Sequence, residues 1–150
     1  MKASKQCLDM LAHHEGVRRK PYQCPAGLWT VGVGHLIGDG KSLPDSWNRT
    51  FSLEEVYDLL AKDVARFEQG VTRLITNPLT QGQFDALVSF SFNLGLGCLQ
   101  RSTVRSALNR GDKIAAMESL RKYNKAGGKV LKGLDNRRKY EEAMFWSKHD

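Results

Sequence analysis

The longest helical pattern in this chain of 150 residues runs over residues 53–74, and it limits the folds that the chain can adopt. Ser52 and Glu55 form a capping box at its start, and Asn77 and Pro78 follow its end. Apolar residues recur mostly at spacings of three and four, namely Leu53, Val56, Tyr57, Leu60, Val64, Phe67, Val71 and Leu74. A helix of this length suits a connector between two lobes.

The segments on either side of this helix differ in their periodicity. Short β-branched and aromatic runs broken by glycine fill residues 22–37, which predicts a small antiparallel sheet of three strands. A first helix is expected before it, ending near Gly16. Helical patterns follow the connector, at residues 80–94, 102–109, 112–123 and 135–146. The chain therefore predicts an α+β fold, with a small β lobe and a mostly helical lobe, within a single domain over 1–150.

Charge is distributed unevenly along the chain. Residues 1–100 hold ten Lys and Arg against ten Asp and Glu, whereas residues 101–150 hold thirteen against six, so the last third carries the whole net charge of +7. Such a surface attracts polyanions, and nucleic acid and an anionic cell envelope both qualify. A solvated helix surface explains the same residues equally well.

The cysteines and the N-terminal residues bear on the cellular compartment. Three cysteines, Cys7, Cys24 and Cys98, have no zinc-type spacing, and free thiols in a reducing cytosol are expected. Charged residues interrupt the first eleven positions, so we expect no signal peptide and no membrane anchor.

One ionisable side chain and two small polar ones stand at the change from helix to sheet. Glu15 ends the first helical pattern, where the negative end of the helix dipole disfavours its ionised form. Cys24 and Thr30 follow in the predicted hairpin. A protonated carboxyl opposite a thiol and a hydroxyl suits acid-assisted chemistry on a water molecule and a leaving group. The alternatives are an exposed helix-end glutamate, a buried structural thiol and an ordinary strand threonine.

The spacing of these three residues resembles the signature of the phage-type lysozymes. That signature is Glu, eight residues, Asp, five residues and Thr, and Glu15, Cys24 and Thr30 match it with Cys in place of Asp. Three segments strengthen the resemblance: W-T-V-G-V-G-H at 29–35, L-T-Q-G-Q-F-D-A-L-V-S-F-S-F-N-L-G at 79–95 and Y-N-K-A-G-G-K-V-L-K-G-L-D-N-R-R-K-Y-E at 123–141. The family implies a two-lobe lysozyme fold that binds peptidoglycan between the lobes.

The resemblance also implies roles for residues. Glu15 becomes the general acid of glycosidic cleavage, and the Thr30 hydroxyl holds the attacking water. Cys24 has two open roles: its thiolate assists water attack with inversion, which we favour, or its sulfur attacks directly with retention. The cationic residues 18–20 are expected to lower the pKa of the thiol.

Further residues resemble supporting positions of the family. Arg137, with Arg138 as the alternative, is expected to pair with the catalytic glutamate. His35 and Asp63 are expected to form a structural ion pair. Saccharide subsites are expected to include Asn93, Gln100 and Leu36, with Gly34 beside them.

The family resemblance implies an endolysin, a muramidase that cleaves the bond between N-acetylmuramic acid and N-acetylglucosamine without a cofactor or metal. We expect a monomer that accumulates in the host cytoplasm and reaches the peptidoglycan through a holin-type lesion. The alternatives are a catalytically silent peptidoglycan-binding module and a lytic transglycosylase. A basic nucleic-acid binder is permitted by charge, but no binding motif supports specific recognition.

Overall fold

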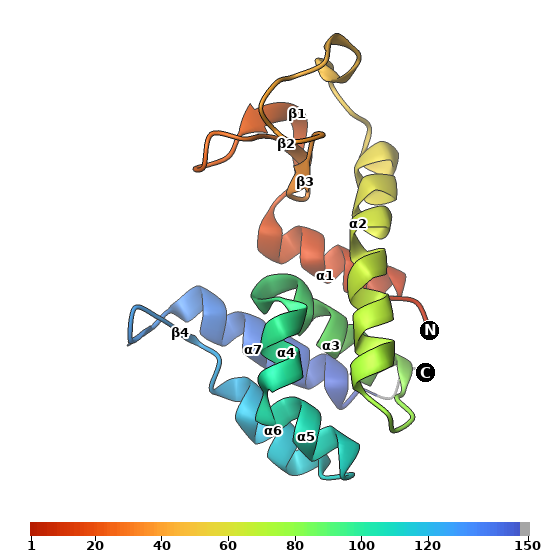
Figure 1. Ribbon diagram of the computed structural model, residues 1–150, viewed down its shortest axis with the longest axis vertical. Helices are drawn as coiled ribbons and strands as arrows, with labels where there is room; N and C mark the ends of the chain where they lie inside the picture. The colour runs from red at the N-terminus through yellow and green to blue at the C-terminus, as the bar shows by residue number, and fades with distance from the viewer. Residues whose placement is uncertain (148–150) are drawn as a thin grey trace. The chain divides into compact units, whose positions relative to one another are not determined.

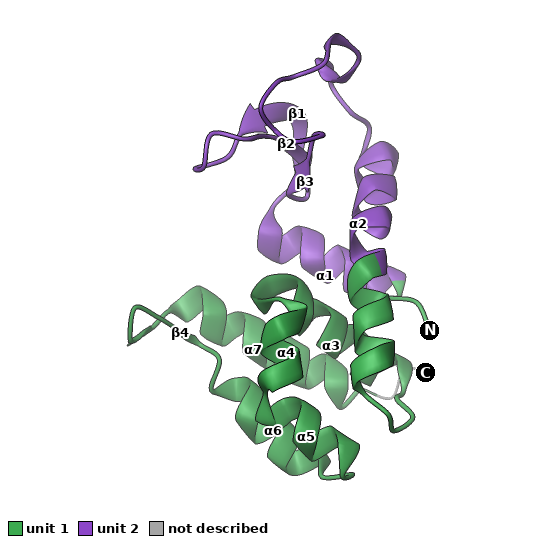
Figure 2. Ribbon diagram, in the orientation of Figure 1, with its two compact units in different colours: residues 1–4, 66–150 green, residues 5–65 purple. Residues whose placement is uncertain are grey.

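The computed structural model describes residues 1–147 and divides into two compact units (Figure 2). Unit 2 comprises Lys5–Ala65, and unit 1 comprises Met1–Ser4 together with the chain from Arg66 onward. The boundary falls inside the long helix α2, Leu53–Leu74, which therefore belongs to both units. This is the connector helix that the apolar pattern predicts.

Unit 2 holds the small sheet (Figure 1). Helix α1, Lys5–Glu15, leads into strands β1, Arg18–Gln23, β2, Trp29–Gly32, and β3, His35–Leu36. The strands are antiparallel in the order β1-β2-β3, and a short 3₁₀ helix, η1 (Asp45–Trp47), lies in the loop before α2. Its core consists of apolar side chains from α1, the sheet and the first half of α2: Cys7, Met10, Leu11, Ala12, Val31, Val33, Ile37, Phe51, Val56, Leu60 and Val64.

The sheet begins earlier than the sequence predicts, at Arg18 rather than at Tyr22. Arg18, Arg19 and Lys20 are exposed, so this half of β1 lacks the alternating apolar pattern that announces a strand. The pairing with β2 is also irregular between Arg18 and Tyr22. Exposed, charged residues are typical of an edge strand, which β1 is.

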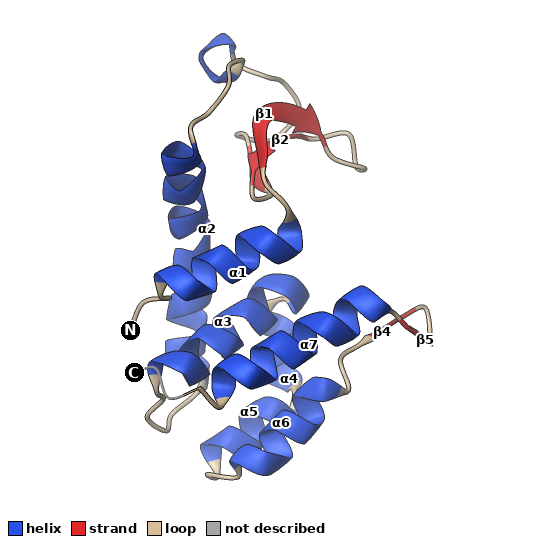
Figure 3. Cartoon of the chain, turned by 180° about the vertical axis from the view of Figure 1, so that it is seen from behind, coloured by secondary structure: helices blue, strands red, loops and turns tan. Residues whose placement is uncertain are grey.

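Unit 1 is helical, and Figure 3 shows its helices from behind. After α2 come α3, Gln81–Leu94, α4, Leu96–Arg101, α5, Thr103–Asn109, α6, Lys113–Arg121, and α7, Lys132–Phe145. A hairpin of β4, Lys125–Ala126, and β5, Lys129–Val130, precedes α7. Helices α3 and α7 pack against each other, and so do α5 and α6.

Helix α3 forms the centre of unit 1. Its residues from Gly82 to Ser91 are all buried, as its nearly continuous apolar surface predicts. Thr80 and Gln83 form the expected capping box at its start. Gly82 is required by the packing, because a Cβ there would collide with the carbonyl oxygen of Met144 in α7.

Three features of unit 1 differ from the sequence prediction. Helix α4 occupies residues that the sequence predicts to be a glycine-rich break. It starts directly after Gly95 and is too short to show a periodic apolar pattern, so the sequence does not reveal it. The β4–β5 hairpin turns at Gly127 and Gly128, inside a segment expected to be loop. Helix α7 begins three residues earlier than Asp135.

The observed elements confirm the α+β class and the mixture of a small antiparallel sheet with helices. That residues 1–150 act as a single catalytic domain stays a prediction. None of the helices within residues 1–147 combines the length and the hydropathy that a bilayer crossing requires.

Candidate active site

Glu15 is the last residue of α1 and is exposed. Gly16 follows with a φ of 85°, and its N–H donates to the carbonyl oxygen of Ala12 at 2.9 Å, which closes the helix. The position at the negative end of the helix dipole is therefore as predicted. Its side chain is not buried against apolar residues.

Cys24 directly follows β1 and opens a tight turn. Its backbone N–H donates to the Leu28 carbonyl at 2.9 Å, and its carbonyl accepts from the Gly27 N–H at 2.7 Å. Gly27 has a φ of 79°, a conformation that glycine adopts without strain. The turn brings the Cys24 side chain, which is half-buried, back over the backbone that leads into β2.

The thiol of Cys24 has a pKa below its ordinary value of 9.0. Backbone N–H groups of Leu28 and Ala26 are the main causes, because they donate hydrogen bonds to the sulfur, and the Thr30 hydroxyl adds a smaller effect. The cationic residues 18–20 are not the cause, so that prediction was wrong. Cζ of Arg18 instead lies 4.3 Å from the centroid of the Tyr22 ring, and Nε of Arg19 donates to the Phe51 carbonyl at 2.7 Å.

Thr30 lies on β2, and its side chain is 5% exposed. Its hydroxyl donates to the Leu28 carbonyl at 2.9 Å and also lies within hydrogen-bond reach of the Cys24 thiol. A hydroxyl has one proton, so it can serve only one of these acceptors at a time. Leu36 on β3 pairs with Thr30 across the sheet and is 43% exposed. The sheet thus gathers Cys24, Thr30 and Leu36.

His35 and Asp63 also meet within unit 2. Nδ1 of His35 lies 2.9 Å from Oδ2 of Asp63, and the imidazole ring stacks on Trp47 of η1 with ring centroids 5.8 Å apart. The pair ties β3 to α2 and to the loop before it. This geometry suits a structural role, which is the role that the sequence interpretation gave it.

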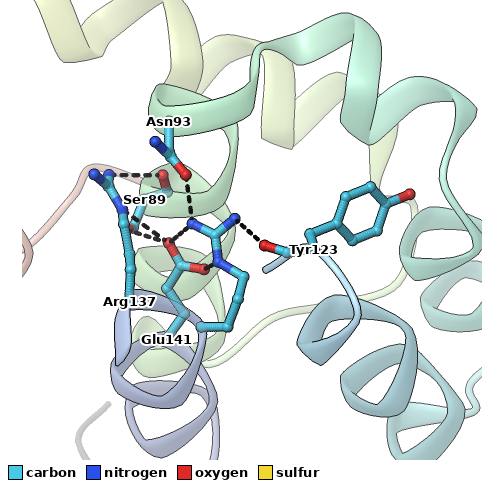
Figure 4. Close-up of polar contacts among 6 residues, drawn as sticks. Ser89, Asn93, Tyr123, Arg137 and Glu141 are labelled. Carbon is cyan, nitrogen blue, oxygen red and sulfur yellow. Dashed lines mark hydrogen bonds and ion pairs between the residues drawn. The ribbon is translucent and has the colours of Figure 1, made fainter. Parts of the chain in front are cut away.

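The remaining candidates lie in unit 1, around a carboxylate at the centre of Figure 4. Glu141 is fully buried, and its carboxylate accepts from the Ser89 hydroxyl at 2.6 Å. Arg138 forms an ion pair with it at 2.8 Å, and Nε of Arg137 lies 3.4 Å from its Oε2. Burial raises the pKa of Glu141, while the two guanidinium groups and the Ser89 hydroxyl oppose that rise.

Arg137 and Arg138 hold different partners in this network. Nη2 of Arg137 donates to the Ser89 carbonyl at 3.1 Å. Nη2 of Arg138 donates to the Asn93 amide oxygen at 2.8 Å, and its Nη1 donates to the Tyr123 carbonyl at 3.4 Å (Figure 4). The Asn93 oxygen therefore accepts a hydrogen bond inside the unit.

Gln100 stands apart from this network. It is exposed at the end of α4, where its carbonyl accepts from Nη1 of Arg105 at 3.3 Å. It lines a surface pocket of unit 1 with other polar residues, and none of them is another predicted site residue.

Sequence reasoning missed Ser89 and Glu141. The signal for Glu141 was present, because it follows Arg137 by four residues and Arg138 by three on one helix, and such pairs lie on one face. Ser89 gave no such signal, since its partner lies 52 residues away. Within residues 1–147, no three His, Cys, Asp or Glu side chains gather as a metal ion would require.

Known proteins resemble this chain over nearly its whole length. The sequence profile of the family described as Phage lysozyme matches residues 12–141. The endolysin of Bacillus phage B103 is 38% identical over 147 residues, which are 97% of this chain but 54% of that protein. The chain thus spans about half the length of the first curated relatives that it matches.

Solved structures agree with the sequence comparison. A crystal structure of a P22 lysozyme mutant superposes with a TM-score of 0.87 at 34% identity, covering 98% of this chain and 99% of that one. The muramidase domain of SpmX from Asticaccaulis excentricus superposes with a TM-score of 0.83 at 31% identity, covering 97% of this chain and 98% of that one. The predicted resemblance is confirmed: this chain belongs to the phage lysozyme family.

Proposed function

We propose that this protein is an endolysin-type muramidase, which hydrolyses the β-1,4 bond between N-acetylmuramic acid and N-acetylglucosamine in peptidoglycan. Membership of the phage lysozyme family carries the proposal, together with similarity to a structure described as a muramidase domain. The hairpin supplies the chemical support, because it holds a thiol of lowered pKa beside a buried hydroxyl in the same unit as Glu15.

Glu15 is the proposed general acid. Cleavage requires a proton for the departing glycosidic oxygen, and the family signature assigns this role to the carboxyl group of Glu15. Arg137 is the proposed partner of this carboxylate, on family resemblance. Gln100, Asn93 and Leu36 are proposed saccharide contacts on the same basis.

Cys24 is proposed to act as the base. Its thiolate, held by neutral N–H groups, takes a proton from water as that water attacks the anomeric carbon. The Thr30 hydroxyl orients the water. This route inverts the configuration at the anomeric carbon, whereas direct attack by sulfur would retain it through a covalent intermediate.

The decisive experiment follows the release of new reducing ends and the turbidity of a peptidoglycan suspension. Glu15→Gln removes the acid with little change in shape, and we expect both signals to fall to background while peptidoglycan still binds. Unchanged activity in this variant would remove Glu15 from the mechanism. Sedimentation with peptidoglycan by the unaltered protein, without sugar release, would indicate the silent binding module, and anhydro sugar products would indicate a lytic transglycosylase.

The stereochemistry and the delivery route need separate tests. The anomer formed first, observed by proton NMR, distinguishes inversion from retention. Access through a holin-type lesion, host cytoplasmic accumulation and a monomeric state are proposed on family resemblance alone. Lysis that requires co-expression of a holin, and a monomer mass in solution, are the expected results.

A further inference from the structure

A pocket in unit 1 holds none of the residues proposed for catalysis and shares only Gln100 with the proposed saccharide contacts. It has a volume of about 390 Å³ and lies along α4 and α5. Two arginines, Arg101 and Arg105, line it together with uncharged polar side chains, and no carboxylate is among the lining residues. Because its surface is cationic and rich in hydrogen-bond donors, it is suited to an anionic ligand.

The guanidinium group of Arg105 is held in place from behind. Its Nε donates to the Leu74 carbonyl at 3.1 Å, and its Nη1 donates to the Gln100 carbonyl at 3.3 Å. These bonds use two of its five N–H groups and fix the plane of the fork. The side chain is half-buried, so little rotational freedom is left for a ligand to remove.

Other side chains make the pocket wall similarly rigid. Asn109 accepts from the Thr76 N–H at 2.9 Å and donates to the Leu74 carbonyl at 3.0 Å. The Ser106 hydroxyl donates to the Thr103 carbonyl at 3.2 Å. Arg101, in contrast, is exposed at the rim, where its guanidinium group can close over a ligand.

Two other arginines of unit 1 differ from Arg101 and Arg105, because each of them forms an ion pair with a nearby carboxylate. Arg110 lies 3.6 Å from Asp112, and Arg121 lies 2.8 Å from Glu142, so both are neutralised locally. The pocket contributes two positive charges within a segment, residues 101–150, that already carries the whole surplus of the chain. Long-range attraction therefore favours a polymer with repeated negative charges over a small anion.

We propose that this pocket binds a phosphodiester group of an anionic cell-wall polymer. Two guanidinium groups, with the polar side chains of Gln100 and Thr103 beside them, offer donors in more than one plane, and a tetrahedral phosphate can accept from several of them at once. A planar carboxylate accepts well from one fork only. The inference goes beyond hydrolysis, since it assigns the helical unit a separate contact with the wall.

The test measures binding by isothermal titration calorimetry, with the full chain and poly(glycerol phosphate) as the probe. Arg101→Gln removes one positive charge at the exposed rim, so the fold is retained, and the dissociation constant should rise about tenfold. Arg73→Gln is the matched control, because Arg73 is an exposed arginine of the same unit outside the pocket, and its effect should stay below about twofold. Arg105→Lys keeps the charge but not the fork and should also weaken binding.

Alternative ligands complete the design. Inorganic phosphate should compete for the pocket, whereas acetate at equal ionic strength should not. Polyglutamate of equal charge tests for a carboxylate site, and phosphatidylglycerol vesicles test for a lipid headgroup. Equal losses in Arg101→Gln and Arg73→Gln would overturn the proposal in favour of diffuse attraction. Tighter binding to polyglutamate or to vesicles than to poly(glycerol phosphate) would overturn it as well.

Discussion

The turn around Cys24 in unit 2 and the network around Glu141 in unit 1 differ in the groups that surround an acidic side chain and in how deeply that side chain is buried. Each surrounds an acidic side chain with hydrogen-bond donors. At Glu141 the donors are two guanidinium groups and a hydroxyl, and the carboxylate is fully buried. At Cys24 the main donors are neutral backbone N–H groups, and the thiol is half-buried.

The difference agrees with a structural role for the Glu141 network and with the chemical role proposed for Cys24. A buried carboxylate between two cationic partners holds them by ion pairs in a medium of low dielectric, and removal of one partner from such a set is strongly destabilising. It therefore fixes helix α7 against α3. A thiol supported by neutral dipoles gains thiolate character without a permanent counter-charge, and its partial exposure leaves it open to water.

The largest effect is expected from breaking the network of unit 1. Glu141→Gln keeps the shape of the side chain but removes the buried charge that pairs with Arg137 and Arg138, which should cost about 3–5 kcal/mol of unfolding free energy. Urea unfolding followed by circular dichroism measures the change.

The neighbouring glutamate provides a matched control for this loss. Glu142 makes a part-exposed pair with Arg121 at 2.8 Å, so Glu142→Gln should cost less than about 1 kcal/mol. Equal losses of unfolding free energy in the two variants would show that burial does not determine how much the Glu141 network contributes to stability.

The second effect concerns the turn, and it is read from the pH dependence of peptidoglycan hydrolysis. The thiolate forms as the pH rises through the pKa of Cys24, so the rate should rise with pH over a range below the ordinary value of 9.0. Each pH unit below that pKa should cost about tenfold in thiolate and hence in rate.

Replacement of the thiol moves this rising limb. An aspartate ionises near pH 4 in its ordinary state, so Cys24→Asp should shift the limb toward acid and gain relative activity at about pH 6. Cys24→Ser cannot form an anion in this range and should lose the rising limb altogether. Overlapping profiles of the unaltered protein and Cys24→Ser would mean that sulfur takes no part in the reaction.

The two regions also differ in how far the sequence predicts them. The candidate site could be proposed from the sequence because Glu15, Cys24 and Thr30 lie within 16 consecutive residues, and the structure brings Cys24 and Thr30 together. The cause of the thiol's lowered pKa could not be found, since it depends on the direction of the N–H groups of Leu28 and Ala26. Nearby positive charges in the sequence suggested a different cause.

The network and the pocket of unit 1 depend on tertiary contacts. Glu141 meets Ser89 across 52 positions, and Arg105 meets the Leu74 carbonyl across 31. Helix periodicity predicts that α3 is buried, but not which polar atoms it buries. The long helices and both capping boxes were predictable because their signals are local, whereas the one-turn α4 and the edge strand β1 were not.

The smallest effect compares one substitution in both regions. Gly82→Ala places a Cβ against the Met144 carbonyl oxygen, and the packed helices α3 and α7 must separate to accept it, which should cost about 1–3 kcal/mol. Gly27→Ala meets no atom within 4 Å and costs only the strain of a φ of 79°, about 1 kcal/mol. Gly133→Ala, in the same helix as Met144 but in open space, should be neutral or slightly stabilising. We expect the urea midpoints to fall in the order Gly133→Ala, Gly27→Ala and Gly82→Ala, from highest to lowest. This order would show that helix packing sets the cost of an added Cβ in unit 1, whereas backbone conformation sets that cost in the turn. The reverse order of the last two would contradict that distinction.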